Sequence, residues 1–293
     1  MQADSQIRLN LSAGLASVGV ALVLVLLKLW ALMQTGALSI AASMADSAMD
    51  LLISGAGLWA IIYAARPADD DHTFGHSSVE DLVSLGQALF VMASALSIGW
   101  LAIRRLVSDT PPDLEAEGAG IAVMLVAVVL TAGLVLWQRR VARRTGNKVV
   151  AADMLHYVGD LLPTIGAILA LVLSKTMGLS KVDSVIALIA AGLMLHGARG
   201  IGANAWHALM DRAADPEIVA GIETIAADWP GVRGYHDLQT RTAGSKLFVN
   251  LHIELDGEQT LREAHDIGAA LKRGIVAAYP QAEVIIHKDV WHG

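Results

Sequence analysis

The chain has 293 residues, of which 55% are hydrophobic and 17% are charged, and its mean hydropathy is +0.53. Soluble globular proteins carry about 25% charged residues, so this composition excludes an ordinary soluble enzyme and a disordered chain and indicates a membrane protein. The net charge of −7 argues against a nucleic-acid binder, and the absence of cysteine excludes disulfides and thiolate metal sites.

Residues 1–210 contain six apolar segments. A helix needs about 20 apolar residues to cross the hydrocarbon layer of a bilayer. Three of the segments carry no charge, and each of the other three is interrupted by isolated charged residues. The first is too long for a removable signal peptide. We therefore expect six transmembrane helices over Leu9–Leu27, Leu38–Ala65, Leu82–Ile103, Gly118–Gln138, Val149–Ser174 and Val182–Ala208.

The connection between the fourth and fifth segments is short and strongly basic. It contains Arg139, Arg140, Arg143, Arg144 and Lys148. Loops rich in lysine and arginine stay on the cytoplasmic side of a membrane. Because an even number of spans returns the chain to its starting side, we expect both termini to be cytoplasmic.

Residues 211–293 have a soluble composition, with 21 charged side chains. In the stretch Lys246–Leu255, apolar and polar residues alternate, which is typical of a strand with one buried face. The sequence thus predicts a membrane all-α six-helix domain over residues 1–210, followed by a small α+β cytoplasmic domain over residues 211–293. The order in this second domain is αββαβ, with a helix, two strands, a helix and a strand at Pro216–Asp228, His236–Thr242, Lys246–Leu255, Thr260–Tyr279 and Glu283–Asp289.

Ionisable residues interrupt two of the apolar segments at regular spacing. Asp46 and Asp50 lie four residues apart, as do His156 and Asp160, so each pair shares one helix face. A charge at the centre of a bilayer costs about 2.5–3.5 kcal/mol and usually marks a functional site. Together the four side chains could surround one divalent cation, and zinc accepts these ligands, as do iron, manganese, cobalt and cadmium. The alternative is a structural ion pair of Asp46 or Asp50 with Lys28, but one lysine cannot neutralise three carboxylates.

Metal binding at such a site competes with protons. A ligating imidazole must be neutral and a ligating carboxylate ionised, so a bound metal displaces protons and protonation expels the metal. Histidine changes charge near physiological pH, which makes His156 the natural exchange group. This chemistry suits a metal/proton antiporter.

Four motifs resemble the cation diffusion facilitator family, and within it the bacterial zinc/proton antiporters. They are SMADSAMD at residues 43–50, PADDDHTFGH at 67–76, ADMLHYVGD at 152–160 and VIIHKD at 284–289. The resemblance covers nearly the whole chain. It implies a homodimer in the bacterial inner membrane that exchanges zinc for protons, with a ferredoxin-like cytoplasmic domain.

The resemblance also implies three groups of metal ligands. The first is the transport site formed by the two spaced pairs described above, with Leu155 as a hydrophobic gate beside it. The second lies in the loop after the second span, where a solvated acidic loop is the alternative: Asp69, His72 and His76. The third is a binuclear zinc site in the cytoplasmic domain, where a solvated polar sheet face is the alternative: His236, His252, His265, His287 and Asp289.

Two positions depart from the family pattern. The relatives carry a lysine where this chain has Ser78, and that lysine pairs with an aspartate at the start of the soluble domain, which is Asp211 here. We therefore expect this link to be absent or made differently. Lys288 replaces a glutamine and is expected to add charge near the cytoplasmic-domain site.

The sequence thus predicts a transporter and not an enzyme. It would export divalent metal cations, zinc first, by proton-coupled alternating access. Ferrous iron, cadmium or manganese as the main ion is one alternative, and a membrane-bound zinc sensor without transport is another. An intramembrane protease would need a His-Glu-x-x-His or Gly-x-Gly-Asp motif, and the sequence has neither.

Overall fold

The computed structural model describes residues 2–35, 38–107, 118–177 and 182–292. Within these ranges it leaves some side chains undescribed, at residues 2–4, 35, 38–43, 45–46, 118–124, 162–164, 166–177 and 182–183. The chain divides into two compact units, Gln6–Ala205 and Trp206–Gly293, the second of which also includes Met1–Ser5.

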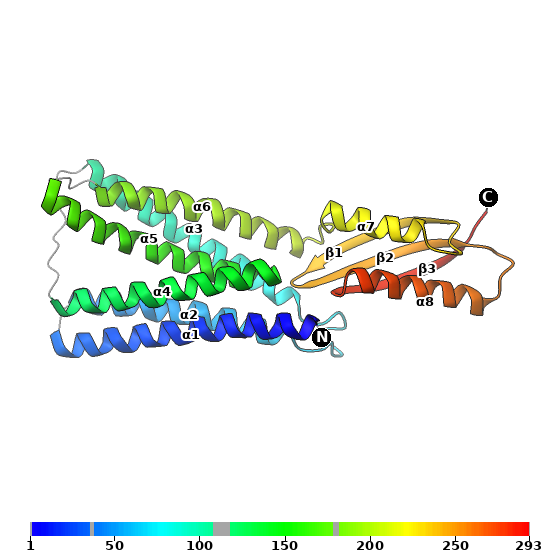
Figure 1. Cartoon of the computed structure of the whole chain (residues 1–293), viewed down its shortest axis with the longest axis horizontal. Helices are drawn as coiled ribbons and strands as arrows, with labels where there is room; N and C mark the ends of the chain where they lie inside the picture. The colour runs from blue at the N-terminus through cyan, green and yellow to red at the C-terminus, as the bar shows by residue number, and fades with distance from the viewer. Residues whose placement is uncertain (1, 36–37, 108–117, 178–181, 293) are drawn as a thin grey trace. The chain divides into compact units, whose positions relative to one another are not determined.

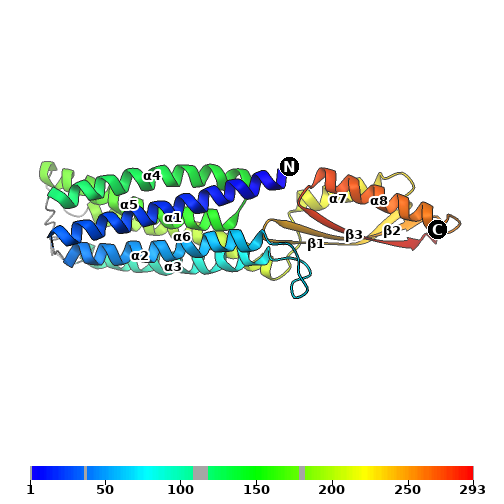
Figure 2. The same ribbon diagram turned by 90° about the horizontal axis from the view of Figure 1, so that it is seen from below.

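The first unit consists of long helices that run alongside one another (Figures 1 and 2). In chain order they are α1 (Gln2–Thr35), α2 (Leu38–Ala64), α3 (Ser78–Val107), α4 (Gly118–Thr145), α5 (Lys148–Met177) and α6 (Val182–Leu209). Each corresponds to one predicted span, and α2 ends one residue before the predicted end at Ala65. The six-helix prediction for the membrane domain is therefore confirmed.

Five of these helices are long and apolar enough to cross a membrane over the residues that the structure describes. The qualifying stretches are Ser5–Gln34, Ser47–Ala64, Ser78–Val107, Leu125–Thr145 and Ser184–Leu209. Large apolar side chains on their surfaces are exposed, such as Leu52 (66%) and Val129 (70%). In a soluble protein such side chains would form patches that bind other surfaces, whereas lipid accommodates them without cost.

Helix α5 packs against α2, α3 and α4. Small side chains such as Ala60 and Ala152, which are fully or almost fully buried, make this close packing possible. The apolar contacts near one end of the bundle include Ile61, Val141 and Val149. Helix α5 thus holds a central position, from which its polar side chains can reach several neighbouring helices.

The second unit is a two-layer α/β domain with helices α7 (Pro216–Ala227) and α8 (Leu261–Ala278) on one face of a sheet (Figure 2). The strands are β1 (Gly234–Ala243), β2 (Lys246–Leu255) and β3 (Ala282–Val290), in the spatial order β1-β2-β3. Strand β2 pairs antiparallel with β1 and parallel with β3. The predicted αββαβ order is confirmed. It matches a ferredoxin-like fold without the first strand.

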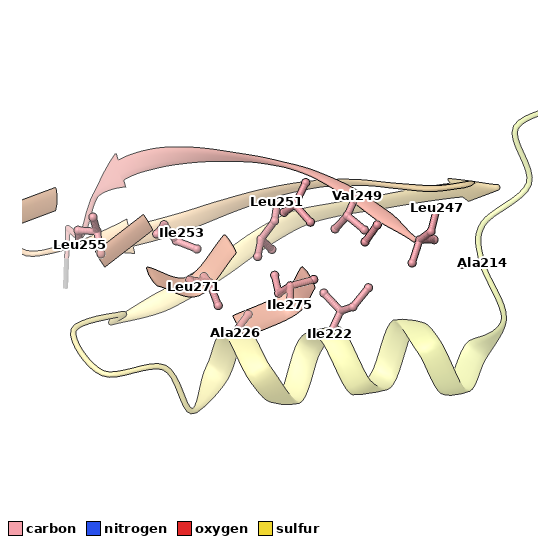
Figure 3. Close-up of a cluster of buried hydrophobic side chains, with 12 residues drawn as sticks. Ala214, Ile222, Ala226, Leu247, Val249, Leu251, Ile253, Leu255, Leu271 and Ile275 are labelled. Atoms are coloured by element: carbon pink, nitrogen blue, oxygen red, sulfur yellow. The ribbon is translucent and has the colours of Figure 1, made fainter. Parts of the chain in front are cut away.

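The core of this domain lies between the sheet and the two helices (Figure 3). The alternating apolar residues of β2 supply one side of it, and α7 and α8 supply the other through Ile222, Leu271 and Ile275, which are fully buried. Helix α8 begins with a capping box in which Thr260 and Glu263 satisfy each other's backbone N–H groups, an arrangement that stabilises a helix by about 1 kcal/mol. Because one sheet face is covered in this way, the polar residues of β2 lie on the opposite face.

Candidate metal centres

The first candidate centre joins α2 and α5 inside the helical bundle. His156 Nε2 lies 3.0 Å from Asp50 Oδ1 and 3.8 Å from Asp160 Oδ2. Asp50 and His156 are 7% and 5% exposed. The spacing of four residues places His156 and Asp160 on one face of α5, as the sequence predicts. The ligand atoms of the three residues lie within 4.8 Å of one another, which suits one small cation.

Aromatic rings surround the His156 imidazole. The Phe90 ring of α3 meets it edge-on, with 5.7 Å between ring centroids, and the adjacent Tyr157 ring lies 5.5 Å away. These contacts restrict the orientation of the imidazole, so Nε2 stays directed at the carboxylates. The Asp46 side chain lies outside the described part of the structure, and its place in the site stays a prediction. Lys28, which the alternative interpretation pairs with Asp46 or Asp50, donates a hydrogen bond to Ser47 Oγ at 2.6 Å.

The second candidate centre lies in the loop after α2. Asp69 Oδ1 is 3.3 Å from His72 Nδ1, and Asp69 Oδ2 is 3.2 Å from His76 Nε2. The loop folds back through backbone hydrogen bonds, and Gly75 adopts a left-handed φ of 84° where the chain turns. The His72 backbone N–H donates to Asp69 and holds the pKa of that carboxyl below its ordinary value. Asp69 is therefore ionised at neutral pH and available to a cation.

The third candidate centre lies on the uncovered face of the three-stranded sheet. The strand register places His236 opposite His252, and His252 beside His287. Asp289 Oδ2 lies 2.9 Å from His252 Nδ1 and 3.4 Å from His236 Nε2, and Asp289 Oδ1 lies 3.1 Å from His287 Nε2. Hydrogen bonding to His252 lowers the pKa of Asp289, with further lowering by the nearby histidines. One carboxylate thus lies among three imidazoles from three adjacent strands.

His265 and Lys288 are placed differently from the strand residues of this centre. His265 lies exposed on α8, which covers the opposite face of the sheet from His252, so its place in the site stays a prediction. Lys288 was expected near the centre, but its side chain lies elsewhere. Its side chain runs along Gly268 of α8, close enough that a Cβ at Gly268 would lie 2.6 Å from Lys288 Cε. Neighbouring strand residues point to opposite faces, so Lys288 faces the helix layer while His287 faces the centre.

A buried polar network beside the first centre was not predicted. It is centred on Asp153, which lies on α5 three residues before His156 and is 4% exposed. The sequence shows an acidic residue within an apolar span, but it does not show which residues form hydrogen bonds with it. They come from α1, α2 and α4: Ser17, Ser54 and Gln138.

A second unpredicted link ties the first turn of α3 to the turn before α5. Lys148 Nζ lies 2.6 Å from Asp81 Oδ1, and the Asn147 amide donates to Glu80 at 2.7 Å. Both carboxylates are buried and lie in the first turn of α3, where the helix dipole favours negative charge. This pair lies one turn beyond Ser78, the position of the missing family lysine. Asp211, the other half of the family link, pairs with Arg241 at 3.2 Å.

Removing the Lys148 charge is expected to destabilise the first unit. In Lys148→Ala the fully buried Asp81 loses its ion pair, which costs about 3–5 kcal/mol. Lys246→Ala is the matched control, because its partner Glu283 is half-exposed and such pairs contribute about 0–1 kcal/mol. Thermal unfolding of the purified protein in detergent measures both effects. Equal shifts in the two variants would contradict a special role for the Asp81 pair.

Both units of the chain match known protein families. The model of the cation efflux transmembrane domain matches residues 14–210, and that of the cation efflux protein cytoplasmic domain matches residues 214–290. The cation-efflux pump FieF of Klebsiella pneumoniae is 39% identical over 282 residues, or 96% of this chain and 93% of the relative. The same pump from Escherichia coli O127:H6 shows the same identity and coverage. The solved structure MamM-CTD is 25% identical and covers 26% of this chain and 96% of its own, with a TM-score of 0.25.

The matched models and relatives extend over both units of the chain, and the apolar helices have the length that a membrane requires. The chain is an integral membrane protein that belongs to the cation diffusion facilitator family of divalent-cation efflux proteins.

Proposed function

We propose that the protein exports zinc in exchange for protons. The observation that supports this most directly is the first candidate centre, where an imidazole from α5 meets carboxylates from α2 and α5 within an apolar bundle. With Asp46 as the fourth ligand, the set is one nitrogen donor and three carboxylates. Zinc accepts such a set in tetrahedral geometry. The cation at this site is the transported substrate.

Proton coupling follows from the same ligands. His156 Nε2 can bind either a proton or the metal, and the carboxylates of Asp50 and Asp160 lie beside it as ligands for the same cation. Entry of a divalent cation therefore displaces a proton, and a proton arriving from the other side weakens metal binding. An inward proton gradient would then drive the cation outward.

Alternating access would require α2 and α5 to rearrange, because these two helices carry the ligands. In this proposal residues 1–210 carry out transport and residues 211–293 sense metal, with both termini in the cytoplasm and the protein in the inner membrane. Zinc captured by the third centre would draw two copies of the chain together and bias the membrane domain. The cytoplasmic-domain match supports a role in dimerisation.

Zinc flux into sealed vesicles tests the proposal. Purified protein in proteoliposomes with an imposed pH gradient is supplied with zinc, ferrous iron, cadmium or manganese in turn, while metal uptake and internal pH are recorded. We expect zinc to enter the vesicles while protons leave the vesicle interior. Zinc binding without flux would instead favour a membrane-bound sensor, and a larger flux of another ion would change the substrate.

The nitrogen donor is expected to control which ion is carried. His156→Asp converts the set to carboxylates alone, which suits harder ions such as manganese better than zinc. We expect the ratio of zinc to manganese flux to fall by more than the ~10-fold typical of outer-shell changes. His196→Asp is the matched control, because His196 belongs to none of the three centres over the described residues. An unchanged flux ratio in His156→Asp would show that nitrogen ligation does not select the ion.

A further inference from the structure

Asp153 is a buried carboxylate that the proposed transport chemistry does not use. Ser17 of α1 donates to Asp153 Oδ2 at 2.5 Å, and the Gln138 amide of α4 donates to the same oxygen at 2.6 Å. Ser54 of α2 donates to Asp153 Oδ1 at 3.3 Å. The three partners are at most 1% exposed. One side chain of α5 therefore connects α5 to three other helices.

The network lies directly beside the metal ligands. Ser54 is four residues after Asp50 on α2, and Asp153 is three residues before His156 on α5, so the bond between them joins the adjacent turns of both helices. Tyr157, the residue after His156, makes a second link across the same helix pair, with its hydroxyl 2.9 Å from Ser54 Oγ. The helices that supply the two sides of the metal centre are thus held together about one turn from it.

Burying a carboxylate at this position costs free energy. An apolar side chain of similar size would pack among α1, α2 and α4 without the cost of burying an ionisable group, which in a membrane protein normally marks function. Metal centres respond strongly to such neighbours, because ligand atoms must sit within about 0.2 Å of their preferred distances. A change in how α2 lies against α5 would alter the distance between Asp50 and His156.

We propose that Asp153 is a positioning residue for the transport site, which holds α1, α2 and α4 against α5 and thereby sets the separation of Asp50 and His156. The inference rests on the proposed transport function of that site. The proposed positioning depends on the hydrogen bonds of Asp153 and not on its charge. Asparagine can keep them, because its amide oxygen accepts from Ser17 and Gln138 while its amide nitrogen donates to Ser54.

Zinc flux by the full-length protein in proteoliposomes separates the two contributions. We expect Asp153→Ala to raise the KM for zinc roughly 10–100-fold, the range for losing an outer-shell partner, with a smaller effect on the maximal rate. Asp153→Asn should recover most of the loss. An unchanged KM in Asp153→Ala, or an Asp153→Asn variant as impaired as Asp153→Ala, would overturn the proposal.

A serine variant covers the case in which Asp153→Ala does not fold. Ser54→Ala removes the hydrogen bonds from Ser54 of α2 to Asp153 and Tyr157 of α5 and should raise the KM for zinc. Ser97→Ala, at an exposed serine that donates to Ala93 of its own helix, should not. Equal KM values for these two variants would overturn the proposal. Wild-type flux distinguishes this failure from that of the transport function, because the absence of wild-type zinc/proton exchange would refute the function itself.

Discussion

Asp50→Ala is expected to abolish zinc-driven proton release in proteoliposomes. The variant removes the carboxylate 3.0 Å from His156 Nε2, which is the shortest contact of the proposed transport site. Loss of an outer-shell partner costs 10–100-fold in metal affinity, so loss of a direct ligand should exceed about 100-fold. Because Asp50 is 7% exposed, water cannot easily replace the missing oxygen. Metal uptake and internal pH, recorded together, measure the effect.

The controls separate loss of a ligand from loss of the fold. Asp50→Asn keeps the shape of the side chain but not its charge, and it should also be inactive while eluting as a folded protein in gel filtration. Asp228→Ala removes an exposed carboxylate at the end of α7 and should transport normally. Undiminished flux in Asp50→Ala would exclude the intramembrane site.

Zinc is expected to stabilise the isolated fragment 211–293 and to shift it toward a dimer. The fragment should fold by itself, because its core is made only of residues between Ala214 and Ile286. A ligand at 100 times its dissociation constant contributes about 2.7 kcal/mol, which raises the midpoint of a domain this size by roughly 10–20 °C. Calorimetry with and without zinc measures the shift, and sedimentation measures the dimer.

Substitutions and pH test whether this effect comes from the third centre. His252→Ala should remove most of the shift, whereas His292→Ala, at an exposed residue after β3, should not. An imidazole must be deprotonated to bind metal, so the zinc effect should weaken as the solution is acidified. Asp289 stays ionised in mildly acidic solution, because its pKa is lowered from 3.8. A zinc effect independent of pH, or equal in the two variants, would assign the metal to another site.

The sequence predicts the outline of this structure because the strongest local signals are periodic. Apolar runs of about 20 residues locate the helices, and the alternation along Lys246–Leu255 locates the sheet faces. The spacing of His156 and Asp160 predicts that both face one centre. The approach of Asp50 is a tertiary contact between residues 106 positions apart, and it was inferred from the cost of buried charge and the family resemblance.

Local sequence patterns do not predict polar contacts between residues that are far apart in the chain. Asp153 has partners 136 and 99 residues away in Ser17 and Ser54, and nothing in the spacing of these residues indicates that they meet. The pair Asp81–Lys148 spans 67 residues. An irregularity between His236 and Gln239, where Asp237 has a φ of 49°, also interrupts the pairing of β1 with β2. Such a bulge depends on strand pairing and twist, which a single strand sequence does not specify.

The row of His236, His252 and His287 across three paired strands has a consequence for signalling. Backbone ladders fix the spacing of the Cα atoms of these residues, so the backbones of the apo and holo forms of one domain should superimpose closely, and loading should cost little conformational entropy. A preorganised site of this kind cannot report occupancy by refolding. In the proposed sensing role, zinc would therefore act electrostatically, because a bound dication would reverse the local field on the sheet surface and make it attractive to acidic groups on a neighbouring molecule.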